Sequence, residues 1–110
     1  MPGHFAYCVS VGGLWMLTRS VGVELGPHGI CVVNIDCGAV ATPINEATMN
    51  EATMNDPAKM KARDAAIPLG WMASPQDIAE VVVFLGCEQG GYMTATTVFL
   101  DGGMQGRVCL

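Results

Sequence analysis

The stretch ICVVNIDCGAVATP, residues 30 to 43, determines how the rest of the chain is interpreted. Its first half is apolar and rich in β-branched residues, a pattern typical of a buried strand. The run ends at Gly38 and leads into Thr42-Pro43, which are residues typical of a turn or loop. We therefore predict a strand over residues 30 to 36 whose carboxyl end leads into a functional loop.

A helix is predicted before this strand, over about residues 5 to 26, where Gly26-Pro27 ends the pattern. The apolar residues that recur every three or four positions are Leu14, Leu17, Val21 and Leu25. Three glycines inside this helix, Gly12, Gly13 and Gly22, would each cost about 1 kcal/mol relative to Ala. Either the helix packs closely against another element or it is weak on its own.

Further elements follow the loop. A short helix is predicted from Asp56-Pro57 to about Ala66, because Asp is a good cap and Pro suits the first turn. A longer helix begins at Ser74-Pro75, where Asp77 completes a capping box. Its expected apolar face consists of Ile78, Val81, Val82 and Leu85. A second strand is predicted over residues 96 to 100. The tandem repeat of NEATM, residues 45 to 54, only lengthens an exposed segment.

Composition excludes several function classes. The 110 residues are 51% hydrophobic and carry a formal net charge of -5, with only five Lys and Arg, so we expect no nucleic-acid binding. We expect no membrane insertion, since no apolar run approaches the ~18 residues of a span. The start of the chain lacks the pattern of a signal peptide. His4 and His28 are isolated, so no metal site is expected.

The cysteines indicate a reducing compartment. They are five in number, an odd count, and show no CxxC pair. Their positions are Cys8, Cys31, Cys37, Cys87 and Cys109. We therefore predict a cytoplasmic protein without a disulfide framework.

Five motifs then occur in a fixed order. They are YCVSVGG at 7–13, LTRSVGVELGPHGI at 17–30, CGAVATP at 37–43, SPQDIAEVVVFL at 74–85 and TTVFLDGG at 96–103. In this order they resemble the carboxyl-terminal half of a short-chain dehydrogenase/reductase, with the glucose-dehydrogenase-like branch as the nearest type.

The resemblance implies an α/β fold, the carboxyl-terminal part of a Rossmann-like doubly wound parallel sheet. About two parallel strands, two long helices and one short helix are expected. Residues 1–110 would form a partial domain, from the catalytic helix to the last strand. The amino-terminal dinucleotide-binding half, with the family's Gly-rich loop and catalytic Ser, would be absent from this chain.

The resemblance also implies site residues. In the family a Tyr on the first helix is the general acid/base for the substrate hydroxyl or carbonyl, and Tyr7 matches it. A free phenol titrates at about pH 10, so the family places a Lys four residues later, whose charge favours phenolate and which holds the nicotinamide ribose. Val11 replaces that Lys here. The alternative is that Tyr7 is an ordinary residue at the start of an amphipathic helix.

The loop after the first strand matches the family's Pro-Gly-x-Val-x-Thr motif, which contacts the nicotinamide cofactor. Gly38, Val40 and Thr42 match, and the resemblance implies that they bind NAD or NADP. Cys37 replaces the Pro, and Asp36 adds a carboxylate near an anionic cofactor. A reactive thiol at Cys37 is the less favoured alternative, because no His is adjacent.

Two functional hypotheses remain open. The first is an NAD(P)-dependent oxidoreductase acting on a CH-OH group of an alcohol, ketone or sugar, inactive alone and completed by a second polypeptide. The second is a non-catalytic remnant or an oligomerisation module. Since two strands and their helices leave apolar faces uncovered, the expected partners are further copies of the chain or a complementary amino-terminal half.

Overall fold

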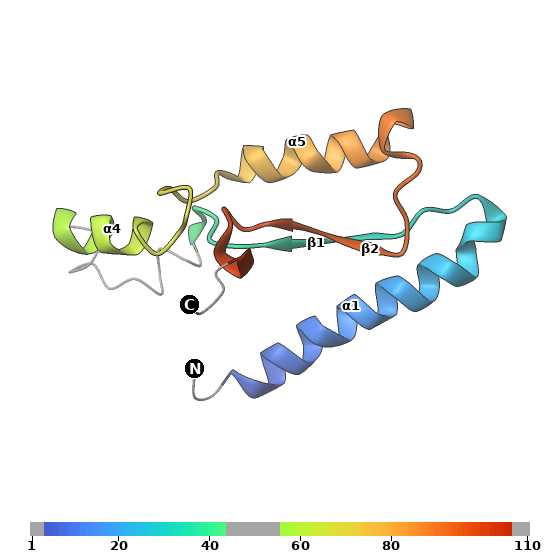
Figure 1. Ribbon diagram of the computed structural model, residues 1–110, viewed down its shortest axis with the longest axis horizontal. Helices are drawn as coiled ribbons and strands as arrows, with labels where there is room; N and C mark the ends of the chain where they lie inside the picture. The colour runs from blue at the N-terminus through green and yellow to red at the C-terminus, as the bar shows by residue number, and fades with distance from the viewer. Residues whose placement is uncertain (1–3, 44–55, 107–110) are drawn as a thin grey trace. The chain divides into compact units, whose positions relative to one another are not determined.

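The computed structural model describes residues 4–43 and 56–106. Its main elements are α1 (Phe5–Leu25), β1 (Val33–Cys37), α4 (Pro57–Asp64), α5 (Pro75–Gly86) and β2 (Thr96–Leu100) (Figure 1). Short 3-10 helices occupy Gly26–His28, Glu88–Gly90 and Met104–Gly106. β1 and β2 form a two-stranded parallel sheet, so the predicted α/β class is confirmed. The NEATM repeat and Cys109 lie outside the described residues.

The first strand begins three residues later than predicted. The chain first turns through the 3-10 helix after α1, and Gly29 adopts a left-handed backbone with φ of 72°. The amide of Ile30 still donates to the carbonyl of Leu25, at 3.3 Å. Residues 30 to 32 therefore connect the turn to the strand, and the apolar pattern alone does not distinguish this connection from a strand.

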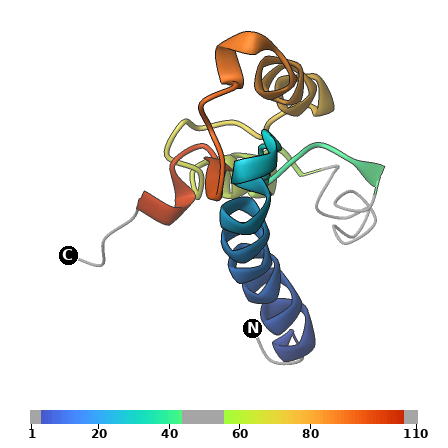
Figure 2. The ribbon, with the colours of Figure 1, turned by 90° about the vertical axis from the view of Figure 1, so that its right-hand side faces the viewer.

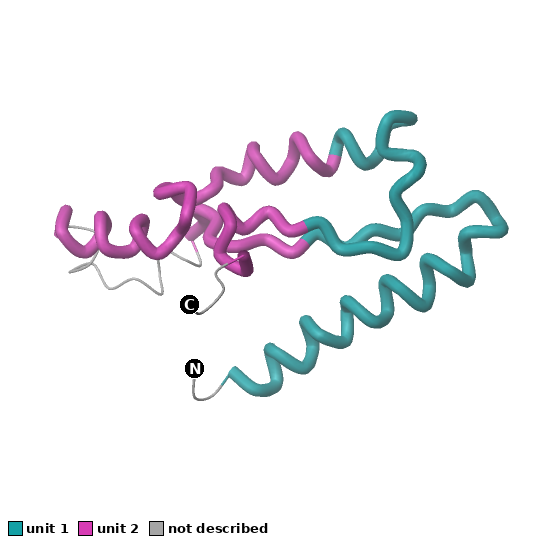
Figure 3. Tube along the Cα trace, in the orientation of Figure 1, with its two compact units in different colours: residues 1–35, 83–98 teal, residues 36–82, 99–110 magenta. Residues whose placement is uncertain are grey.

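Contacts within the chain divide the described residues into two compact units (Figure 3). The first unit consists of residues 1–35 and 83–98, and the second of residues 36–82 and 99–110. The first halves of β1 and β2 pair inside the first unit, and their ends pair inside the second. α1 belongs wholly to the first unit, and Figure 2 shows it as an unbroken helix that leads into its terminal turn.

The covered face of α1 differs from the predicted one. Leu14 and Leu17 are 51% and 56% exposed, so two of the four residues of the expected stripe do not lie in a core. The buried and half-buried positions of the helix are Val11, Trp15, Thr18, Val21, Gly22 and Leu25. Apolar residues are spread around the whole helix, so periodicity could not identify the covered face.

Gly22 explains which face of α1 is covered. A Cβ placed on Gly22 would lie 2.7 Å from both the Cα and the N of Ala95, so backbone meets backbone there. Ala95 itself has a left-handed φ of 54°, and its amide donates to the carbonyl of Val32 at 2.8 Å. A Cβ on Gly12 or Gly13 would meet nothing within 4 Å. Close packing therefore requires a glycine at position 22 but not at 12 or 13.

Helices α4 and α5 both begin at the predicted caps. The Asp56 carboxylate accepts a hydrogen bond from the amide of Ala58, at 3.0 Å. The amide of Ser74 donates to Asp77 at 2.7 Å, and the amide of Asp77 donates back to the Ser74 hydroxyl at 3.2 Å. These two bonds close the predicted capping box. On α5, Ile78, Val81 and Leu85 are half-buried, whereas Val82 is exposed.

A bilayer crossing requires length and apolarity together, and none of the helices formed by the described residues combines them. The long helix α1 carries polar and glycine residues along its length, and α5 has only 12 residues.

Candidate functional site

The loop that follows β1 is held on both sides within the second unit. The amide of Gly38 donates to the carbonyl of Leu100, at 3.0 Å. The amide of Ala41 donates to the carbonyl of Ala73 at 2.8 Å, and the amide of Ala73 donates to the carbonyl of Ala39 at 3.0 Å. Val40 and Ala73 thereby form a parallel β-bridge. The predicted functional loop is thus ordered by two neighbouring segments before any ligand binds.

Position 38 requires a glycine because the backbone directly after β2 lies very close to it. A Cβ at this position would lie 2.6 Å from the Cα of Asp101 and 2.9 Å from its Cβ. No rotation of a side chain could relieve a contact with a backbone atom. The glycine therefore lets the loop approach the turn after β2, and this requirement was invisible in the sequence.

The Asp101 carboxylate organises that turn. It accepts hydrogen bonds from the amide of Gly103 at 2.8 Å and from the amide of Gln105 at 2.7 Å. These bonds, that from Gln105 above all, hold the pKa of Asp101 below its usual value of 3.8. The Gln105 side chain in turn donates to the Asp36 carboxylate at 3.3 Å. Asp36, which was expected to place a carboxylate near an anionic cofactor, therefore accepts a hydrogen bond from a neutral side chain.

The lowered pKa of Asp101 predicts acid sensitivity. Because the folded-state pKa lies below 3.8, the carboxylate stabilises the fold above that pH, and the stabilisation is lost as the pH falls through the lower folded-state value. Asp101→Asn should be less stable than wild type at neutral pH and should depend less on pH in this acidic range. Urea unfolding at about pH 2.5 to 6 measures both. An unchanged acid profile would contradict this role of the carboxylate.

The Cys37 thiol is not activated. Although the residue as a whole is exposed, partial burial of the sulfur raises its pKa above the usual 9.0, and the adjacent Asp36 carboxylate raises it further. The thiolate is the nucleophilic form, so both effects oppose reactivity near neutral pH. The structure thus favours the plain-substitution interpretation of Cys37.

Tyr7 and Val11 lie on α1, in the first unit. Tyr7 is 68% exposed, and its carbonyl accepts a hydrogen bond from the Ser10 hydroxyl at 2.7 Å. Val11 follows Tyr7 by four residues, so the two side chains share one face of the helix. A side chain at position 11 could therefore reach the phenol, but Val offers it neither a charge nor a hydrogen-bond donor.

The candidate residues fall into two groups. Tyr7 and Val11 are brought together on α1, and Gly38, Val40 and Thr42 lie together in the loop of the second unit, where Val40 and Thr42 are half-buried. Their roles in chemistry stay predictions. Within residues 4–43 and 56–106, no cluster of three His, Cys, Asp or Glu side chains is arranged to hold a metal ion.

Sequence reasoning missed an apolar pocket in the second unit. One wall of the pocket is formed by Ile67, Pro68, Leu69 and Trp71, which follow the predicted short helix and to which the sequence assigned no functional role. A run of apolar residues between two helices was the available signal, because surface connections are normally more polar.

Comparison with known proteins gives consistent results. Residues 1–105 match the model of a family described as "Enoyl-(Acyl carrier protein) reductase". The chain is 39% identical over 102 residues to a 3beta-hydroxysteroid dehydrogenase 1 of Eggerthella lenta, covering 92% of this chain and 37% of that protein. The chain thus spans less than half the length of this curated relative.

Two solved structures extend the comparison. A short chain dehydrogenase family protein from Francisella tularensis aligns with a TM-score of 0.87 and 29% identity, over 97% of this chain and 46% of that one. The L-sorbose reductase from Gluconobacter frateurii, complexed with NADPH and L-sorbose, aligns with a TM-score of 0.81 and 28% identity, over 93% and 41%. Both the sequence and the fold of this chain are thus similar to those of dehydrogenases and reductases.

Proposed function

Because the chain belongs to the short-chain dehydrogenase/reductase family, we propose that it forms the carboxyl-terminal portion of an NAD(P)-dependent oxidoreductase. The substrate would be a secondary alcohol or the corresponding ketone, with sugars and hydroxysteroids as the classes that its relatives' names suggest. The observation that carries the proposal is the loop from Gly38 to Thr42, which matches the family motif and is held by hydrogen bonds on both sides.

The loop fits the neutral part of a nicotinamide cofactor. Residues 36 to 43 contain no Lys or Arg, so they offer backbone groups and the Thr42 hydroxyl but no cation for a diphosphate. Gly38, Val40 and Thr42 would hold the nicotinamide amide, and the bound cofactor would accept or donate the hydride. Groups that bind the phosphates would come from the part of the relatives' length that this chain does not span.

Tyr7 is the proposed general acid/base. Its hydroxyl would give a proton to a substrate carbonyl oxygen, or take one from a substrate hydroxyl, as the substrate carbon gains or loses hydride. The phenol is exposed and so is accessible to a substrate. Val11 leaves this proton transfer without the electrostatic support that a Lys on the same face would supply.

The alternative is a non-catalytic module that binds other copies of the chain or a complementary half. Val11 favours it, and so do apolar side chains on α1 such as Phe5 and Val23, which are 78% and 72% exposed. Either partner would cover part of this apolar surface.

The cytoplasm, inferred from the cysteine usage, stays the predicted location.

Calorimetry with NADH and NADPH tests the proposal. The purified chain serves as one sample, and a chimaera in which residues 4–106 follow the amino-terminal portion of the L-sorbose reductase serves as the other. The chimaera should bind NADPH with a Kd in the micromolar range, and Thr42→Ala should weaken binding about 3- to 10-fold by removing one hydrogen bond. Ser10→Ala, which removes a hydroxyl from α1, is the matched control and should bind as tightly as the parent.

The second hypothesis predicts the opposite result. A folded chimaera that binds neither cofactor, together with an oligomeric mass for the isolated chain, would contradict the enzyme proposal and support the interaction module.

A further inference from the structure

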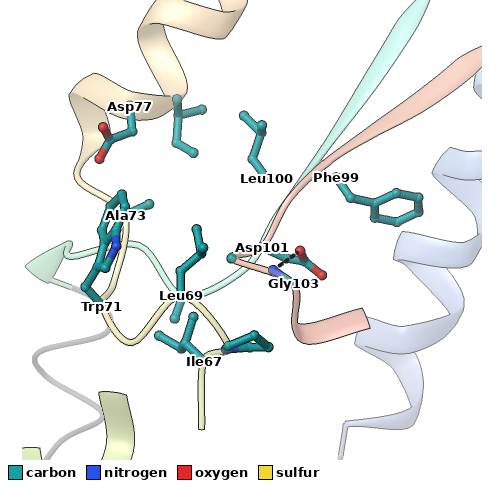
Figure 4. Close-up of a pocket in the computed structure, with 13 residues that line it drawn as sticks. Ile67, Leu69, Trp71, Ala73, Asp77, Phe99, Leu100, Asp101 and Gly103 are labelled. Carbon is teal, nitrogen blue, oxygen red and sulfur yellow. Dashed lines mark hydrogen bonds between the residues drawn. The ribbon is translucent and has the colours of Figure 1, made fainter. Parts of the chain in front are cut away.

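An open apolar pocket lies within the second unit, between the end of β2, residues 67–73 and the first turns of α5 (Figure 4). Its volume is about 480 Å³, which lies within the usual range of small-molecule sites. Most of the residues that line it are apolar, and the larger side chains among them include Ile67, Leu69, Trp71, Ile78 and Leu100. Ile67 is only 4% exposed, whereas Leu69 and Trp71 are 63% and 52% exposed. The pocket therefore has a buried apolar floor and an accessible apolar rim.

The turn after β2 fixes one wall of the pocket. Gly102 and Gly103 both have a left-handed backbone, with φ of 62° and 90°. A Cβ on Gly102 would lie 2.5 Å from Cγ2 of Ile67, so the wall packs as closely as a glycine allows. The amide of Leu69 donates to the carbonyl of Gly102 at 3.1 Å. These contacts hold the two walls at a set separation, so the pocket is largely formed before a ligand arrives.

The charges of the pocket select against anions. The described lining residues include two carboxylates, Asp77 and Asp101, and no Lys or Arg. Asp77 accepts bonds from the Ser74 hydroxyl and amide, and Asp101 accepts bonds from the turn that follows it. Those bonds lower the pKa of both groups, so both are ionised at neutral pH. A ligand with a carboxylate or phosphate would have two like charges nearby, and no cation among the described lining residues to offset them.

We propose that this pocket is a binding site for an uncharged, predominantly hydrocarbon small molecule. The proposal goes beyond the oxidoreductase function and does not rest on it, because the pocket contains none of the candidate residues Tyr7, Gly38, Val40 and Thr42. A preformed apolar cavity favours an apolar ligand, since water gains few hydrogen bonds there. The two carboxylates are already engaged, so the ligand needs no polar group of its own to satisfy them.

A pair of probes that differ only in charge tests the site. Decan-1-ol and decanoate have the same chain length, and Trp71 lies in the wall where its fluorescence responds to a bound hydrocarbon. The measurement uses the full chain with Trp15→Phe, which leaves Trp71 as the sole Trp. Decanol should change the emission saturably at neutral pH, and decanoate should bind about tenfold more weakly because of the carboxylates. Equal affinities for the two probes would overturn the proposal.

Two variants locate the bound probe. Ala73→Leu enlarges a lining residue while keeping its backbone hydrogen bonds, and it should weaken decanol binding about tenfold. Ala79→Leu makes the same enlargement on the exposed surface of α5, outside the lining, and should leave binding unchanged. If Ala73→Leu fails to fold, Leu69→Asn at the exposed rim provides the same test.

The remaining outcomes each decide the question. Decanol binding that neither Ala73→Leu nor Leu69→Asn weakens would place the probe on another apolar surface and overturn the proposal. The proposal would also be overturned if the Trp71 side chain were buried in a dimer and its emission did not respond to decanol. A second copy of the chain would then fill the pocket. Loss of cofactor binding in the chimaera would not affect this result, so the two proposals can fail separately.

Discussion

Replacing Val11 by Lys in the chimaera with the L-sorbose reductase portion is expected to raise kcat/KM about 10²- to 10⁴-fold. General acid/base catalysis by a well-positioned group usually contributes a rate gain of this size, and we expect the Tyr7 phenol to provide it only when a cation lies beside it. Position 11 lies one helical turn from Tyr7 on the same face of α1, so an ammonium there can favour the phenolate. Steady-state kinetics with NADPH and L-sorbose, followed by the absorbance of reduced nicotinamide, measure the gain.

Two controls separate chemistry from a general effect of charge. Val9→Lys adds the same charge two residues from Tyr7, at an exposed position that does not face the phenol, and should give no comparable gain. Tyr7→Phe combined with Val11→Lys should abolish the gain, because the proton donor is lost. A similar increase from Val9→Lys, or no increase from Val11→Lys in a chimaera that binds cofactor, would show that the defect lies elsewhere.

Gly22→Ala is expected to lower the free energy of unfolding by about 1–3 kcal/mol, the cost of overpacking a close contact. The new Cβ would lie 2.7 Å from the backbone of Ala95, so α1 would have to move away from that segment of the first unit. The same substitution at Gly12, where nothing lies within 4 Å, should instead stabilise the helix by up to ~1 kcal/mol. Urea unfolding of the two variants gives opposite shifts of the midpoint.

A further variant identifies the contact that matters. Ala95→Gly removes the side chain at the contact but leaves the Cα and N that a Cβ at position 22 would meet. Because glycine also suits the left-handed φ of 54° at position 95, Gly22→Ala is measured with Ala and with Gly at that position, and most of its cost should persist in the Ala95→Gly background. Equal behaviour of Gly22→Ala and Gly12→Ala would show that α1 does not pack on Ala95 in solution.

The candidate site was predictable in part. The motif around Gly38, Val40 and Thr42 was found from the sequence because it follows a recognisable strand and a family pattern. How the loop is held was not, because its partners, Leu100 and the bridged Ala73, are distant in the sequence. Asp36 illustrates what the sequence could not show. From the sequence its carboxylate was expected to weaken cofactor binding, whereas in the structure it accepts a hydrogen bond from the Gln105 side chain.

The sequence by itself determined the order and type of the elements and the α/β class. Caps, turns and apolar runs are local, and a helix such as α5 is specified by neighbours such as Ser74 and Asp77. Only the tertiary structure decided which face of α1 is covered, why positions 22 and 38 must be glycine, and that a pocket forms beside Ile67. Each of these depends on contact between segments far apart in the chain, and such contacts leave no periodic signal in the sequence.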